Sequence, residues 1–358
     1  LPVSRRLRFL DYITINIYWF ALTVRSQVLT PLIVPVLVQR FVGEAVKGAY
    51  VGRMRLWSLM VAVLVQALMG LLSDRSTLRW GRRRPFIVIG TIAEVVVFVL
   101  LGTIANMQGL AGYTALFGLY ILSMVASNTA HAATQGLIPD LVPESLRGRF
   151  SGVKALLELP VPLIFTSFVV ANMVAQGNLW AALVTLSVVL LVCMALSMLI
   201  REQPIDRPQR ALDWRPIARL ALMTGAFTLV ILGAGAGVNL IMAWVASLTG
   251  SLVPVLTVVF GVVGMGIAVL IGVWLSVSLS LGKDVRHHAS FTWWVTSRLA
   301  FLVGSMNLAS FMLYFMQERF VELAGERAAG PSARVMMFVG IFIMVTALPS
   351  GWLADRFG

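Results

Sequence analysis

Four ionisable side chains lie within long apolar segments of this 358-residue chain: Arg25, Glu94, Glu158 and Arg298. A charged group at the centre of a bilayer costs at least about 2.5–3.5 kcal/mol unless it is paired or hydrated, so each is a candidate functional group. An acid–base pair that opens when its carboxylate takes up a proton could couple proton movement to a conformational change. The alternative is a static pair that only fixes packing. Because Arg298 lies near the end of its segment, we expect it to reach the membrane surface.

A second set of polar residues follows one face of an apolar segment. Asn128, His131 and Gln135 are spaced i, i+3 and i+7, and Thr23 and Gln27 are spaced i, i+4. The groups in such a stripe can hydrogen-bond a polyhydroxylated solute. His131 also changes charge near neutral pH and could carry a proton. The alternative is that it only joins two helices by hydrogen bonding.

Other kinds of chemistry find no support in the sequence. The chain has no Gly-rich phosphate loop, zinc-binding spacing or nucleophile elbow. His287 and His288 lack further ligands at a suitable spacing, so we interpret them as a solvated helix end. We therefore expect neither an enzyme nor a bound metal or cofactor.

Membrane-spanning helices must position these residues. Hydrophobic residues make up 59% of the chain and charged residues only 12%, about half the share of a soluble domain. The apolar residues form ten blocks long enough to cross a bilayer, which needs about 20 residues per helix. The blocks are residues 12–37, 56–73, 84–105, 112–136, 150–172, 178–200, 217–243, 252–282, 290–316 and 333–353. The sequence thus predicts an all-α integral membrane protein with ten transmembrane helices in this chain.

The basic residues that give the chain its net charge of +13 lie mainly in particular loops. Lys and Arg concentrate in the N-terminal segment and in the loops at 74–84, 140–149, 201–219 and 283–286, whereas the loops at 106–111, 173–177 and 247–251 have none. Basic loops remain on the cytoplasmic side. We therefore expect a cytoplasmic N-terminus, with the lipid bilayer and not nucleic acid as the surrounding partner.

Part of the chain is repeated. The segment Gly70–Arg75 (GLLSDR) recurs as Gly351–Arg356 (GWLADR), and Gln39–Val42 (QRFV) recurs as Glu318–Val321 (ERFV) at nearly the same offset. A second copy therefore begins with the ninth block, and we expect its later helices to be missing from this chain. The predicted domains are a six-helix N-terminal bundle (1–200), a cytoplasmic linker (201–216), an inserted Gly-rich helical pair (217–282) and the start of a C-terminal bundle (283–358).

Two loops resemble those of a known family. The run GLLSDRSTLRWGRRRPFI from Gly70 to Ile87 is similar to loop 2–3 of the major facilitator superfamily, in the longer form of the sucrose transporters and the glycoside-pentoside-hexuronide cation symporters. The run LIPDLVPESLRG from Leu137 to Gly148 resembles loop 4–5 of bacterial members. The resemblance covers the chain except the inserted pair. It implies the major facilitator fold and a location in a bacterial inner membrane.

In that family, the loop motif holds the two halves together on the cytoplasmic side while the cavity opens outward. The resemblance implies this gating role for Gly70, Asp74, Arg75, Gly81, Arg82, Arg83, Asp140, Arg147, Asp355 and Arg356. Gly70 would permit a close helix approach, and Asp74 would accept hydrogen bonds from a facing helix N-terminus. The family's helix order also favours Glu158 over Glu94 as a cavity group, with Arg25 as its counter-ion. The predicted solute or coupling-ion site comprises Arg25, Gln27, Asn128, His131, Gln135 and Glu158.

The leading functional hypothesis is a secondary transporter that moves a small polar solute, such as a sugar or glycoside, by alternating access together with a proton or another cation. The alternative is a facilitator-fold accessory or assembly subunit without transport, for example in pigment delivery or light-harvesting assembly. The inserted pair at 217–282 bears on this choice, because its small residues recur four apart (Gly233 and Gly237; Gly264, Ala268 and Gly272). Such residues allow close packing, either within a hairpin or against a membrane-protein partner.

Overall fold

The computed structural model describes residues 8–78, 80–200, 202, 214–246, 253–281, 290, 293–294, 297 and 311–357. Within these residues all regular structure is helical, and nine helical runs are long and apolar enough to span a membrane. The expected all-α membrane fold is thereby confirmed. Most of the predicted ninth span, including Arg298, lies outside the described residues, as do His287, His288 and most of the linker.

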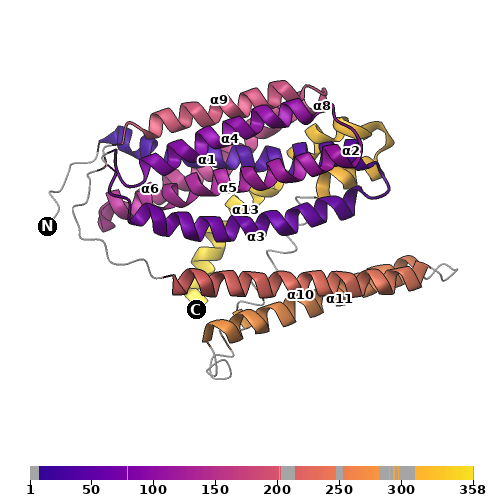
Figure 1. The fold of residues 1–358 in the computed structure, drawn as a ribbon. Helices are drawn as coiled ribbons and strands as arrows, with labels where there is room; N and C mark the ends of the chain where they lie inside the picture. Colours follow the sequence, from indigo (N-terminus) through magenta and orange to yellow (C-terminus); the bar gives the residue numbers. More distant parts are fainter. Residues whose placement is uncertain are drawn as a thin grey trace. The chain divides into compact units, whose positions relative to one another are not determined.

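The chain forms two compact units, residues 1–209 with 309–358 and residues 210–308. The first unit contains the first six spans, which lie side by side (Figure 1). Spans one and five are each interrupted by a short π-helical segment, labelled η. The elements of the six spans are α1 (Phe9–Val28), η1 (Leu29–Ile33) and α2 (Val34–Val42); α3 (Lys47–Asp74); α4 (Arg84–Ile104); α5 (Gly109–Leu141); α6 (Glu144–Glu158), α7 (Pro160–Phe165), η2 (Thr166–Val170) and α8 (Ala171–Ala175); and α9 (Leu179–Ser197).

The first span is the central helix of this unit. Within the most apolar window of each span, 72% of the first span is buried inside the protein but only 11% of α3. Large apolar side chains such as Leu59 and Val63 on α3 are exposed, as expected for a surface that meets lipid. Helices α4 and α5 pack closely at Gly90, where a Cβ atom would lie 2.6 Å from the carbonyl oxygen of Ala126. The solute-facing residues must therefore be sought around α1.

The fifth span is broken in its middle. Helix α6 ends at Glu158, Leu159 has the non-helical angles φ −120° and ψ −73°, and α7 begins at Pro160. Pro160 and Pro162 lack the N–H groups that would continue the helical hydrogen bonds across this point. The two prolines therefore explain the bend in this span.

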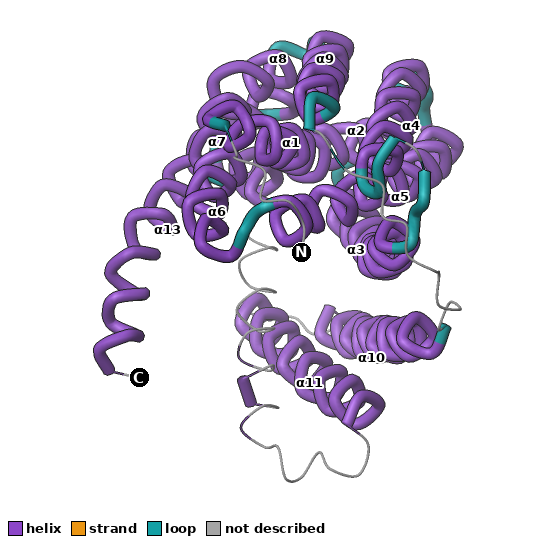
Figure 2. The backbone as a smooth tube through the Cα atoms, turned by 90° about the vertical axis from the view of Figure 1, so that its left-hand side faces the viewer, coloured by secondary structure: helices purple, strands orange, loops and turns teal. Residues whose placement is uncertain are grey.

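Residues from 311 onward pack on the first six spans within the same unit. Residues 311–319 are helical, followed by η4 (Val321–Leu323), η5 (Gly325–Ala328) and α13 (Ala329–Phe357), where η4 and η5 are 3-10 turns. The Tyr314 hydroxyl donates to the Pro35 carbonyl at 2.9 Å, and the start of α13 contacts α7, η2 and α8. The later part of α13 extends away from these helices (Figure 2).

The second unit contains one described helical hairpin, α10 (Arg215–Ala246) and α11 (Val253–Leu281). Its glycines do not all serve close packing as predicted. A Cβ atom at Gly264 would collide with Val238, and one at Gly272 would collide with Phe227. At Gly233 and Gly237, by contrast, a Cβ atom would have no described atom within 4 Å, so these two glycines do not serve close packing within the described hairpin.

Candidate transport site and gate

Five side chains from α1, α5 and α6 contact one another in a row, and we call them the polar face: Gln135, His131, Trp19, Lys154 and Glu158. The Gln135 amide lies 3.2 Å from His131 Nε2, and the imidazole meets Trp19 edge-on with 5.2 Å between ring centroids. Lys154 Nζ lies 3.7 Å from the centroid of the Trp19 ring and 3.5 Å from the Glu158 carboxylate. The polar face thus combines an aromatic ring with neutral and charged hydrogen-bonding groups.

Three members of the polar face lie at one depth in the bundle. Trp19, His131 and Lys154 are each ten residues from the helix end nearest the basic loops, which are Phe9, Leu141 and Glu144 respectively. At 1.5 Å per residue this is about 15 Å, half the thickness of a bilayer core. Solute sites of transporters lie near this midplane.

The remaining predicted site residues separate into two groups. Gln27 is half-buried and borders a small cavity near η2. Asn128 is buried, and its amide donates to the Met124 carbonyl one turn earlier at 2.8 Å. The predicted stripe on α5 therefore continues from His131 to Gln135, whereas Asn128 bonds within its own helix.

Arg25 forms a closed network with two buried partners. Its Nε donates to Glu94 Oε1 at 2.7 Å, its second guanidinium nitrogen donates to the Ser123 hydroxyl, and this hydroxyl donates to Glu94 Oε1 at 2.6 Å. Arg25 is 5% exposed and Glu94 1% exposed. The network joins α1, α4 and α5.

The expected pairing of Arg25 with Glu158 is wrong. Glu158 is bound to Lys154, four residues earlier on α6, and its side chain is 44% exposed. Helix α4 packs against α5 and α9, which both also contact α1, so the long Arg25 side chain can reach Glu94. Sequence position could not reveal this contact, since it depends on how three helices are arranged.

At the end of the bundle that carries the basic loops, Arg83 is the centre of a charged cluster. Its guanidinium pairs with Asp74, donates to Asp140 at 2.9 Å and donates to the Ser73 hydroxyl at 2.5 Å. Arg82 pairs with the same Asp140 carboxylate. The cluster, which we call the basic-end cluster, therefore ties the loop after α3 to the end of α5.

Glycines define the space around this cluster. A Cβ atom at Gly136 on α5 would collide with the Arg83 guanidinium, and Gly81, with φ +110°, adopts a conformation that favours glycine. A Cβ atom at Gly70 would have no described atom within 4 Å. The described structure thus shows no close helix approach at Gly70, and at Gly136, which the sequence gave no reason to choose, the missing Cβ atom leaves room for the Arg83 side chain.

The other predicted gating residues have local roles or undescribed side chains. Arg147 donates to the carbonyls of Val142 and Pro139 at 3.2 and 3.1 Å and so closes the turn between α5 and α6. Arg75 ends α3 as its C-cap residue. Asp355 and Arg356 lie in α13, and their side chains lie outside the described residues.

The comparison with known proteins agrees with this geometry. Residues 44–215, which include spans two to six, match the family described as MFS/sugar transport protein. This match supports assignment to the major facilitator superfamily. No curated protein matches its sequence. The matched family is one of membrane transporters of small solutes, and the match includes both the basic-end cluster and all of the polar face except Trp19.

The first unit has a second charged contact, at the end opposite the basic loops. Arg40, near the end of α2, pairs with Glu326 in η5 and donates to the Ala105 carbonyl at 3.1 Å. Lys47 donates to Gln317 at 3.0 Å and lies 4.5 Å from the centroid of the Tyr314 ring. We call these interactions the opposite-end contact, and they join the first six spans to the segment that begins at residue 311.

Sequence reasoning missed Trp19, Lys154, Gly136 and the opposite-end contact. The sequence does contain a signal for Trp19 and Lys154. Trp19 precedes Thr23 by four residues and Lys154 precedes Glu158 by four, so each shares a helix face with a residue that the sequence analysis had selected. Gly136 and the contact between Arg40 and Glu326 carry no such signal.

Proposed function

We propose that this facilitator protein transports a small polar solute of the sugar or glycoside class by alternating access, coupled to a proton or another cation. The observation that supports this most directly is the aromatic ring of Trp19 among hydrogen-bonding groups at mid-depth. Solute sites typically combine aromatic surface with a few well-placed polar groups. The apolar face of a pyranose ring can stack on an indole while its hydroxyl groups bond to lysine, glutamate and amide groups.

The solute-binding step follows from the burial of Trp19. Trp19 is 4% exposed and Lys154 lies over its ring, whereas Glu158 and Gln135 remain open. A solute that hydrogen-bonds Lys154 and Glu158 would move the ammonium group aside and take its place on the ring. Binding would then exchange an internal ion pair for contacts with the solute.

Glu158 is our candidate for the group that carries the coupling proton. It is the carboxylate of the polar face, its side chain is 44% exposed, and its protonation would release Lys154. The Arg25–Glu94 network is better suited to a fixed structural role, because both its charges are buried and paired.

The two charged ends fit alternating access. We propose that the basic end is cytoplasmic, as the loop charges indicate, in a bacterial inner membrane. The basic-end cluster would then stiffen the cytoplasmic end of the first bundle, and the opposite-end contact would close the outer mouth. The solute site would be open towards the cytoplasm in this conformation.

The test is uptake into proteoliposomes from a panel of labelled sugars, glycosides and hexuronides. Trp19→Ala should reduce uptake of the transported solute at least tenfold, whereas Trp57→Ala, a matched change on the exposed surface of α3, should leave it within twofold. Equal uptake by the parent and Trp19→Ala would contradict the proposed solute site. Uptake of no compound in the panel by the parent, with the protein folded, would contradict the proposed function.

A further inference from the structure

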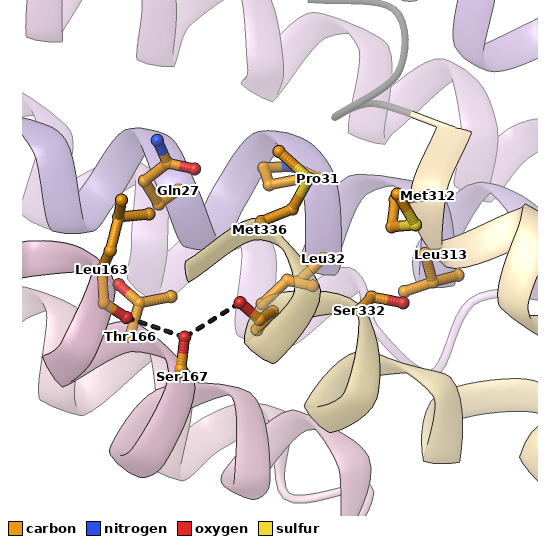
Figure 3. Close-up of a pocket in the computed structure, with 11 residues that line it drawn as sticks. Gln27, Pro31, Leu32, Leu163, Thr166, Ser167, Met312, Leu313, Ser332 and Met336 are labelled. Carbon is orange, nitrogen blue, oxygen red and sulfur yellow. Dashed lines mark hydrogen bonds between the residues drawn. The ribbon is translucent and has the colours of Figure 1, made fainter. Parts of the chain in front are cut away.

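A small cavity lies between the first bundle and the second copy, within the first unit (Figure 3). It has room of about 10 Å³, enough for one particle the size of a water molecule. Its walls come from α1 and η1, from α7 and η2, from residues 312–313 and from the start of α13. The cavity is therefore far too small for the transported solute and needs a separate explanation.

Two buried hydroxyl groups at this cavity have no hydrogen-bond partner in the described structure. They belong to Thr166 and Ser332, each 2% exposed. Many helical Ser and Thr side chains of this unit bond the carbonyl one turn earlier, as Thr91 and Thr134 do at 2.7 and 2.8 Å. Thr166 and Ser332, which both line this cavity, make no such hydrogen bond. A buried polar group without a partner is unfavourable, so a bound ligand is the natural partner for both.

The other groups at the cavity supply further oxygen atoms and no charge. Ser167 donates its hydroxyl hydrogen to carbonyl oxygens, those of Leu163 at 2.7 Å and Ala333 at 3.0 Å, so its free positions towards a ligand are lone pairs. Gln27 also lines the cavity and carries a neutral amide group. Pro31 lacks an N–H, so it cannot donate to a carbonyl one turn earlier in the first span. The residues that line the cavity include no carboxylate.

The backbone around the cavity is irregular in two places. The π-helical segment η1 provides Pro31 and Leu32, and the π-helical segment η2 provides Thr166 and Ser167. π-helical turns occur often at functional sites. Irregular backbone at membrane depth is tolerated where it borders a cavity, and its carbonyl groups are the ligands with which transporters coordinate sodium.

From these observations we infer that the cavity is a binding site for one monovalent cation of the size of Na⁺, held by Thr166, Ser332 and neighbouring neutral oxygens. A hard cation takes oxygen ligands, and a site without carboxylates suits a single positive charge. Since Thr166 belongs to the first bundle and Ser332 to α13, the bound cation would hold the second copy against the first. The inference rests on the proposed transport function only for its role in coupling.

The test is equilibrium binding of ²²Na⁺ to the purified chain without any solute, with choline replacing Na⁺ at constant ionic strength. We expect saturable binding of one Na⁺ per chain, with K⁺ competing at least tenfold more weakly. Thr166→Val and Ser332→Ala should each weaken binding at least tenfold. Thr103→Val on the exposed surface of α4 and Ser187→Ala on α9 should not.

Three outcomes would overturn the site. These are no saturable binding in the parent, unchanged binding in both cavity variants, or an equal loss in the two controls. In the first case the cavity holds water alone. Because the experiment contains no solute, a failure of the proposed transport function leaves its result standing, and a failure of the site leaves the proposed transport open.

Discussion

The ammonium group of Lys154 lies 3.7 Å from the centroid of the Trp19 ring and covers it. Lys154 has a second partner in Glu158, at 3.5 Å, so the lysine is held by an aromatic face and a carboxylate at once. Both contacts are modest, since cation–π interactions contribute about 0.5–2 kcal/mol and exposed ion pairs about 0–1 kcal/mol. A solute can therefore replace them without a large loss of free energy.

Two substitutions at Lys154 should separate the contribution of its charge to solute binding from the contribution of its packing. Lys154→Met should lower the affinity for the transported solute at least tenfold, because a hydrogen bond from a charged group contributes about 1.5–3 kcal/mol. Lys154→Arg keeps the charge and should retain affinity within about threefold. Solute binding to the purified protein measures both. If the methionine variant binds as well as the arginine variant, Lys154 does not contact the solute.

Glu158→Gln should uncouple transport from its driving ion. The amide cannot take up a proton, so uptake driven by a proton gradient should fall at least tenfold while exchange of labelled for unlabelled solute continues. Glu144→Gln, at an exposed carboxylate at the start of α6, is the matched control. Undiminished gradient-driven uptake by Glu158→Gln would remove Glu158 from the coupling step.

The Arg25–Glu94 network predicts a characteristic pattern of stability. Arg25→Met or Glu94→Gln alone leaves a buried polar or charged group without its partner and should destabilise the protein by about 3–5 kcal/mol. The double variant Arg25→Met with Glu94→Gln should lose less than either single variant. Thermal unfolding in detergent compares the three. Losses that simply add would show that the two residues act independently.

Gly136→Ala should displace the Arg83 side chain and so disturb the basic-end cluster. The added methyl group would collide with the Arg83 guanidinium, and overpacking of this kind costs about 1–3 kcal/mol. Gly118→Ala on the same helix has no described atom within 4 Å and should be neutral or slightly stabilising. Unfolding temperature and uptake should both fall only in the first variant. A normal Gly136→Ala protein would mean that Arg83 can move away without cost.

Charge reversal should show whether the opposite-end contact closes the outer mouth. Arg40→Glu or Glu326→Arg alone should shift the population away from the closed form by up to about fivefold, since a partly exposed pair contributes at most about 1 kcal/mol. The double reversal should restore it. Distances between spin labels at Val46 and Val321, both exposed, report the two populations. A double reversal that resembles the single variants would argue against a direct pair.

Much of the fold could be predicted because membrane spans are long and their hydropathy is a local property. The same holds for the break after Glu158, which follows from two prolines alone. The partner of Arg25 could not be predicted, because spacing along α1 gives a helix face but not the helix that this face meets. Gly70 and Gly136 illustrate the same limit. Both are glycines near the basic end, and only the path of the Arg83 side chain decides which one needs to lack a Cβ atom.

The break at Leu159 divides the fifth span into two helical parts that can tilt relative to one another at this residue. The first part, α6, carries Lys154 and Glu158 of the polar face, and the second part carries Thr166 and contacts α13. One part can therefore change its tilt while the other keeps its contacts. Under the proposed transport cycle, solute release and separation from α13 would then be successive steps rather than a single event.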